Sequence, residues 1–128
     1  MTGKHSLAAA KRVVVKIGSA LLVDRERGTV HRKWLETLAE DVNRLRQRGQ
    51  EVVLVSSGAI AVGRHYLGLS GGRLRLEEQQ AAAAAGMVRL VHNYQEVLAQ
   101  FDLTVAQVLM TLDDSDNRRR YLNARNTL

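Results

Sequence analysis

The sequence predicts an α/β protein with a mostly parallel sheet covered by helices. Two observations lead to this prediction. Residues 12–17 and 51–55 are short, nearly continuous apolar runs, as expected of strands buried in a parallel sheet. Each run ends in a turn of small residues and is followed by sequence with apolar residues at helical spacing. Strands that alternate with helices in this way are typical of parallel, helix-covered sheets.

The first half of the chain contains two strand–helix units. Residues 24–28 form a polar loop after the first strand. The helix that follows ends at Gly49 and has apolar residues at helical spacing, namely Trp34, Leu35, Leu38, Ala39, Val42 and Leu45. The strand at residues 51–55 is expected to lie centrally in the sheet, and a helix over residues 59–67 starts directly behind its turn.

The second half begins with a glycine-rich loop at residues 68–72. A long helix follows, with a predicted apolar face at Leu76, Ala83, Met87, Leu90, Tyr94 and Leu98. The alanine run at residues 81–85 favours helix and is small enough to let another helix approach closely. A third strand is predicted over residues 103–110, and Asp113 or Asp114 is a suitable N-cap for a last helix.

Composition restricts the class of protein. A chain of 128 residues is expected to form one domain, with residues 1–10 as a disordered tail. The absence of cysteine excludes disulfides and thiolate metal sites and fits a reducing cytoplasm. The four histidines have no metal-ligand spacing, and no apolar run approaches the roughly 20 residues that span a membrane.

The net charge of +6 favours anionic partners. These could be nucleic acids or small phosphorylated substrates. Apart from residues 118–120, the arginines are dispersed over predicted helices, which favours a solvated surface over a nucleic-acid site.

Lys16, Gly18 and Ser19 form the first candidate site, at the end of the first strand. A lysine here needs a counter-charge or an open cleft, and it could stabilise a phosphoryl group in transfer. Gly18 would let the backbone approach an anion closely, and Ser19 adds a hydroxyl and an N–H. The alternative is a strand-end lysine that extends into water.

Ser56, Ser57, Gly58 and Ala59 form the second candidate site, between a strand and a helix. Their amides and hydroxyls could bind a carboxylate or a phosphate, although a plain helix cap explains the same residues. No P-loop, dinucleotide fingerprint or hydrolase elbow is present. The acidic residues Asp113, Asp114 and Asp116 could bind magnesium, but a capping role at a helix start is preferred.

Three segments together resemble the amino acid kinase family: residues 15–19, 55–64 and 120–128. The resemblance runs from about residue 12 to residue 128, and it is strongest to the members that phosphorylate the side-chain carboxylate of L-glutamate in proline biosynthesis. The sequence departs from the family pattern at Met87, where glutamine is common, and at Ala20, where serine or threonine is common.

This resemblance implies a three-layer fold with helices on both faces of the sheet. Lys16 would be catalytic and would contact the ATP phosphates, with Gly18 and Ser19 lining the phosphate loop. Ser57, Gly58 and Ala59 would hold glutamate. Magnesium would be organised by residues outside this chain.

The resemblance also implies how the whole protein is organised. Residues 1–128 would be the N-terminal, substrate-binding part of the kinase domain. They would include neither the nucleotide-binding half nor a PUA domain, and they would be inactive on their own. The whole enzyme would be a cytoplasmic homo-oligomer, with proline as a candidate inhibitor.

Two alternatives remain open. One is a sister kinase of the same family that acts on a different carboxylate, carbamate or phosphate. The other is a non-catalytic, basic RNA-binding or regulatory module. The two retained turns argue against this module, and so does the low aromatic content of 4%.

Overall fold

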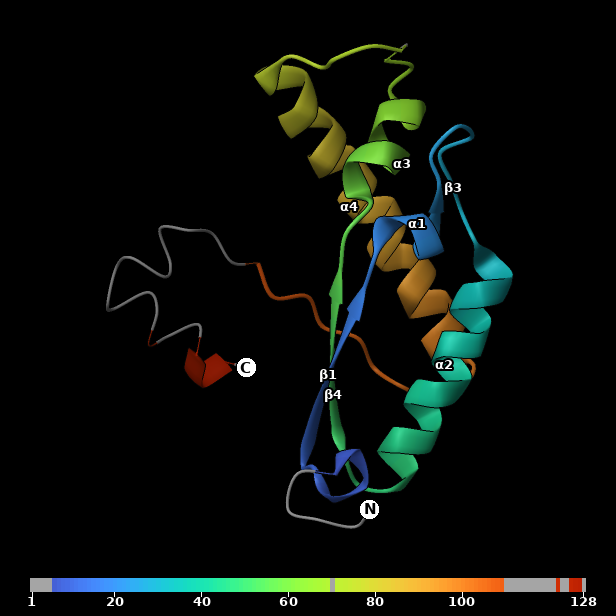
Figure 1. Ribbon diagram of the computed structural model, residues 1–128, viewed down its shortest axis with the longest axis vertical. Helices are drawn as coiled ribbons and strands as arrows, with labels where there is room; N and C mark the ends of the chain where they lie inside the picture. The colour runs from blue at the N-terminus through green and yellow to red at the C-terminus, as the bar shows by residue number, and fades with distance from the viewer. Residues whose placement is uncertain (1–5, 70, 110–121, 123–124, 128) are drawn as a thin grey trace.

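The computed structural model describes residues 6–69, 71–109, 122 and 125–127 (Figure 1). In chain order the elements are η1 (Leu7–Ala9), β1 (Arg12–Ile17), α1 (Ser19–Leu22), β2 (Val23–Asp24), β3 (Thr29–Val30), α2 (Arg32–Gln47), β4 (Glu51–Ser56), α3 (Ala59–Tyr66) and α4 (Leu76–Ala99). The first two of the three predicted strands and the three predicted helices between residues 30 and 99 are confirmed. No described helix has the length and apolar character needed to cross a membrane.

Strands β1 and β4 form a parallel pair, with α2 as the crossover between them. Their register runs from Arg12 opposite Glu51 to Ile17 opposite Ser56. An ion pair of 2.8 Å between the Arg12 and Glu51 side chains joins the first residues of the two strands. Figure 1 shows α1 and α3 at the end of the sheet toward which both strands point. The parallel sheet with its helices confirms the predicted α/β class.

The core lies between one face of this strand pair and helices α2 and α4. Alternation along β1 directs Ile17 into the core and leaves Lys16 exposed. Helix α2 contributes Leu35, Ala39 and Val42, and α4 contributes Leu90, Tyr94, Val97 and Leu98. On the opposite face of the sheet, Val14 is 61% and Val55 is 49% exposed. The described helices therefore cover one face, where the family resemblance implies helices on both.

Helices α3 and α4 cross at small residues. A Cβ atom added at Gly63 would lie 2.6 Å from the carbonyl carbon of Ala82, and one added at Gly86 would lie 2.6 Å from that of Ala59. The close approach expected of the alanine run is therefore present.

This crossing also corrects the predicted apolar face of α4. Ala82 and Gly86 are buried in the N-terminal half in place of Ala83 and Met87, while Leu76 is 65% exposed. The predicted face follows the larger side chains Leu76 and Met87, whereas α3 packs closely against Ala82 and Gly86, where only small residues fit between the two backbones.

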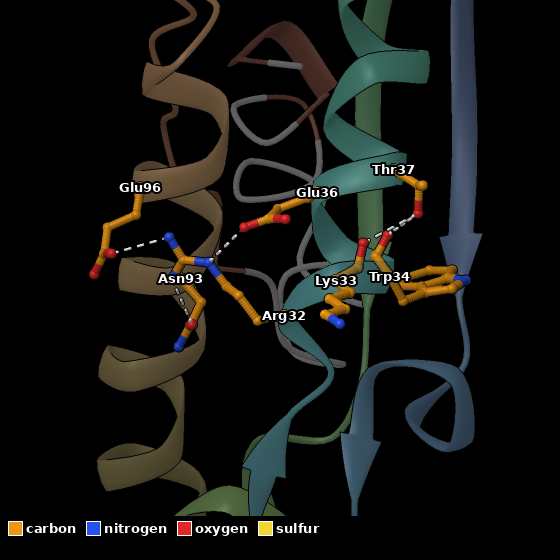
Figure 2. Close-up of polar contacts among 7 residues, drawn as sticks. All are labelled: Arg32, Lys33, Trp34, Glu36, Thr37, Asn93 and Glu96. Atoms are coloured by element: carbon orange, nitrogen blue, oxygen red, sulfur yellow. Dashed lines mark hydrogen bonds and ion pairs between the residues drawn. The ribbon is translucent and has the colours of Figure 1, made fainter.

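A polar cluster joins α2 to α4 on the surface (Figure 2). The Arg32 guanidinium donates hydrogen bonds to Asn93 Oδ1 at 3.2 Å and to Glu96 Oε2 at 3.0 Å, and its Nε lies 3.8 Å from Glu36 Oε1. Because these side chains are partly solvated, we assign them a modest role in helix orientation.

The connecting segments differ from the sequence analysis in three places. The polar loop predicted at residues 24–28 contains the turn of the β2–β3 hairpin, and the two strands of this hairpin and the preceding α1 were not predicted. Residues 6–10, predicted as part of a disordered tail, include the turn η1, because the buried Gln50 side chain donates to the carbonyls of Leu7 and Ala10 at 2.7 and 2.8 Å.

The third correction concerns residues 103–109, which belong to no strand in the described part of the chain. Leu103 and Val105 pack against the core with the exposed Thr104 between them. This alternation resembles that of a strand, but a strand also needs a backbone partner, and the side-chain pattern cannot supply one. Met110 and the predicted caps Asp113 and Asp114 lie outside the described residues.

Candidate functional site

The two turns predicted as anion sites lie side by side at the C-terminal end of the sheet. The N–H of Ser57 donates to the carbonyl of Ile17 at 3.4 Å, which continues the β1–β4 pairing by one bond. A Cβ atom added at Gly58 would lie 3.5 Å from Cβ of Ser19. The register of two parallel strands therefore brings together turns that are about forty positions apart in the sequence.

The backbone conformation of the first turn does not require a glycine at position 18. Gly18 has φ −72° and ψ 148°, which any residue can adopt, and a Cβ atom here would meet no atom of the described residues within 4 Å. As far as the structure describes the chain, the space beside Gly18 is open. Ser19 follows at the start of α1, and its Oγ accepts a hydrogen bond of 3.0 Å from Arg25 of the β2–β3 turn.

The second turn does need its glycine. Gly58 has φ +107°, in the left-handed region, and a Cβ atom would lie 2.9 Å from Cγ2 of Val23. This conformation carries the chain from β4 directly into α3, where the N–H groups of the first turn have no intrahelical partner. Ser57 is exposed, and Ala59 is partly buried against the core.

Lys16 lies next to these turns but on the other face of the sheet from the core. It pairs in register with Val55, and both side chains are exposed. Within the part of the chain that the structure describes, Lys16 makes no ion pair. Its ammonium group is therefore available to an external anion.

Tyr94 of α4, which sequence analysis placed only in the core, contacts the second candidate turn. Its ring is buried, and its hydroxyl donates to Ser56 Oγ at 2.9 Å. Burial raises the pKa of the Tyr94 phenol, and the hydrogen bond with Ser56 opposes this only in part. The sequence could have indicated this contact, because the hydroxyl of a tyrosine predicted to be buried usually has a polar hydrogen-bond partner.

A cleft of about 590 Å³ adjoins the first turn, between the β2–β3 hairpin and α3. It is lined by Ser19 of α1, by Arg25 of the hairpin turn, and by Ile60 and His65 of α3. Arg64 also lines it and donates to the carbonyls of Leu69 and Gly72, which holds the loop after α3 in place. Sequence analysis missed Arg25, because nothing in the sequence shows that the hairpin turns it back toward Ser19.

The residues fit a phosphate group better than a metal ion. Exposed amide-rich turns beside a lysine suit an anion. Among the described residues there is no group of three or more His, Asp or Glu side chains that could hold a metal ion. The acidic candidates Asp113, Asp114 and Asp116 lie outside the described residues, as do Arg118, Arg119 and Arg120.

Comparison with known proteins identifies the family. The model of the amino acid kinase family matches residues 11–128. The glutamate 5-kinase of Paramagnetospirillum magneticum is 66% identical over 122 residues, which is 95% of this chain and 33% of that enzyme. The glutamate 5-kinase of Rhodospirillum rubrum is 62% identical over 115 residues, covering 90% and 31%. That of Ruegeria sp. is 58% identical over 123 residues, covering 96% and 33%.

This chain therefore spans about a third of the length of the curated relatives it matches. The family match, in contrast, extends over nearly all of the chain and includes both turns at the end of the sheet. On that ground, the chain belongs to the amino acid kinase family.

Proposed function

We propose that this chain supplies the glutamate-binding turn and part of the phosphate-binding site of an ATP-dependent glutamate 5-kinase. The observation that carries the proposal is the hydrogen bond from the Ser57 N–H to the Ile17 carbonyl, which holds the two turns against each other. A kinase with a carboxylate acceptor needs two anionic groups in adjacent subsites. Similarity to glutamate 5-kinases at 58–66% identity supports glutamate as the acceptor.

The turn formed by Ser57, Gly58 and Ala59 would bind glutamate. Its amides at the start of α3 suit a carboxylate, because the N–H groups and the positive end of the helix favour negative charge. The side-chain carboxylate oxygen of glutamate would then attack the γ-phosphorus of ATP. The bond to the β–γ bridging oxygen breaks, and ADP leaves with that oxygen, which gives L-glutamyl 5-phosphate.

The turn formed by Gly18 and Ser19, together with Lys16, would bind the phosphates. The open space at Gly18 would let the backbone approach a phosphoryl oxygen without a side chain in the way. The ammonium group of Lys16, which makes no ion pair with the described residues, would stabilise charge on the phosphoryl group during transfer. Magnesium, when bound, would neutralise phosphate charge, and the described residues include no cluster that would hold it.

The test is a chimeric enzyme in which this chain replaces the matching third of the Paramagnetospirillum magneticum glutamate 5-kinase. Glutamyl phosphate is an acyl phosphate, so hydroxylamine traps it as a hydroxamate that can be quantified. We expect hydroxamate formation that depends on both ATP and glutamate, and none from aspartate or N-acetylglutamate. A folded chimera that phosphorylates another acceptor, and not glutamate, would favour a sister kinase of the family. A folded chimera with no kinase activity that binds RNA tightly would favour the binding module.

A further inference from the structure

A short relay of hydrogen bonds runs from the core into the glutamate turn. The Tyr94 hydroxyl donates to Ser56 Oγ at 2.9 Å, and Ser56 Oγ donates to the carbonyl oxygen of Ser57 at 3.3 Å. Tyr94 is anchored on α4 and is only 7% exposed, whereas Ser56 and Ser57 are exposed. The relay therefore joins a buried side chain of α4 to a solvent-facing turn.

The relay ends on the Ser57–Gly58 peptide group of the proposed glutamate turn. The carbonyl of Ser57 and the N–H of Gly58 belong to one planar peptide group and point in opposite directions. A hydrogen bond that holds the carbonyl therefore also sets the direction of the Gly58 N–H. This control is needed, because Gly58 has no side chain and adopts a backbone conformation with φ +107° that only a glycine reaches easily.

We propose that Tyr94 is a positioning residue that acts through Ser56 to orient the Ser57–Gly58 peptide for binding the carboxylate of the acceptor substrate. The inference rests on the proposed function, because it assigns a supporting residue to that same turn. Tyr94 does not touch the substrate. Its contribution is to limit the turn to one orientation before the substrate arrives, which lowers the entropy lost on binding.

Packing alone does not account for the hydroxyl. A phenylalanine ring would fill the same space between α4 and the sheet, so the oxygen is the part of Tyr94 that the core does not require. Burial of the phenol raises its pKa above 10.0, so it remains a neutral donor at physiological pH. Its donor bond to Ser56 leaves the Ser56 hydrogen free to bond the Ser57 carbonyl.

The experiment compares Tyr94→Phe, Ser56→Ala and the double variant in the chimeric enzyme. We expect Tyr94→Phe to raise the KM for glutamate by about 3–10-fold, in the range of one lost hydrogen bond, with a smaller change in the KM for ATP. Ser56→Ala should have a similar effect, and the double variant should be no worse than either single variant, because both break the same relay. Tyr66→Phe is the matched control, since Tyr66 lies on α3 with 58% of its surface exposed, and it should change neither constant.

Amide hydrogen exchange gives a second readout that does not depend on catalysis. Exchange at Gly58 should become faster in Tyr94→Phe while exchange within β1 and α2 stays unchanged. Unchanged KM values and unchanged exchange at Gly58 would overturn the inference. So would equal increases in both KM values, or multiplicative effects in the double variant.

The two proposals can fail separately. If Tyr94→Phe has no effect in a chimera that phosphorylates glutamate, the positioning role fails and the proposed function stands. If the folded chimera does not phosphorylate glutamate, the proposed function fails, and the exchange rate at Gly58 alone decides whether Tyr94 orients the turn.

Discussion

Substitution of Gly63 by alanine should be among the most destabilising single changes in the chain, although it adds only one methyl group. The new Cβ atom would lie 2.6 Å from the carbonyl carbon of Ala82 and 2.7 Å from the amide nitrogen of Gly86. Carbon atoms in van der Waals contact are about 3.5–4.0 Å apart, so α3 and α4 would have to separate by roughly 1 Å. The obstructing atoms belong to a helix backbone and cannot rotate away.

The expected cost follows from this geometry. Overpacking of a core costs about 1–3 kcal/mol, and a clash with backbone is expected at or above the upper end of that range. For a domain of this size, a loss of about 3 kcal/mol corresponds to a decrease in Tm of roughly 10–15 °C. Separation of the helices would also loosen Val62, which lies beside Gly63 in α3 and is part of the main core.

Thermal and urea unfolding followed by circular dichroism measure this effect. Gly71→Ala is the matched control, since a Cβ atom there meets nothing within 4 Å, and it should leave Tm within about 2 °C of the parent. Gly86→Ala should behave like Gly63→Ala, and the double variant should cost less than the sum, because both methyl groups separate the same pair of helices. A decrease in Tm of less than about 3 °C for Gly63→Ala would refute the close crossing.

Four further predictions concern the turns and their support, and the first three are measured in the chimeric enzyme. Lys16→Ala should lower kcat by about 10²–10³-fold, as expected for the loss of one charge-stabilising donor. It should leave Tm nearly unchanged because the side chain is exposed. Near-normal turnover would contradict the phosphate role of Lys16. Gly18→Ala should leave Tm unchanged, because the added Cβ atom meets no atom of the described residues within 4 Å. It should raise the KM for ATP, because the methyl group would keep a phosphate away from the backbone. An unchanged KM for ATP would show that no ligand approaches this backbone. Ser57→Ala should raise the KM for glutamate more than that for ATP, and the reverse order would place the turn in the other subsite. Burial raises the pKa of Tyr94 above 10.0, so its contribution to the free energy of unfolding should be complete below pH 10 and should decline as the pH rises through the higher folded-state pKa. Urea titrations between pH 9 and about pH 11 should therefore show a shallower decline in the free energy of unfolding for Tyr94→Phe than for the parent.

Much of this fold could be predicted from local pattern. The valine runs define β1 and β4, because consecutive apolar residues of strand length suit a parallel sheet. The spacing of Leu35, Ala39 and Val42 defines the buried side of α2, and Gly49 ends it with φ +81°. These features depend on residues a few positions apart, which is the range over which periodicity is informative.

The candidate turns could also be recognised from the sequence, as a small-residue segment behind each strand. One further step gives their adjacency, because the carboxyl ends of parallel strands lie at the same edge of a sheet. The structure confirms that Ser19 and Gly58 lie side by side. The ligands assigned to these turns remain predictions.

Other features were decided by tertiary structure alone. The buried face of α4 shifts by one residue to Ala82 and Gly86, because the backbone of α3 occupies the space that larger side chains would need. Within the described part of the chain, residues 103–109 form no strand, since pairing depends on a partner distant in the sequence. The bond from Tyr94 to Ser56 likewise joins residues 38 positions apart. Periodicity shows which residues share one side of a helix, whereas the side that is buried and the atoms that a buried hydroxyl meets are set by how the elements pack together.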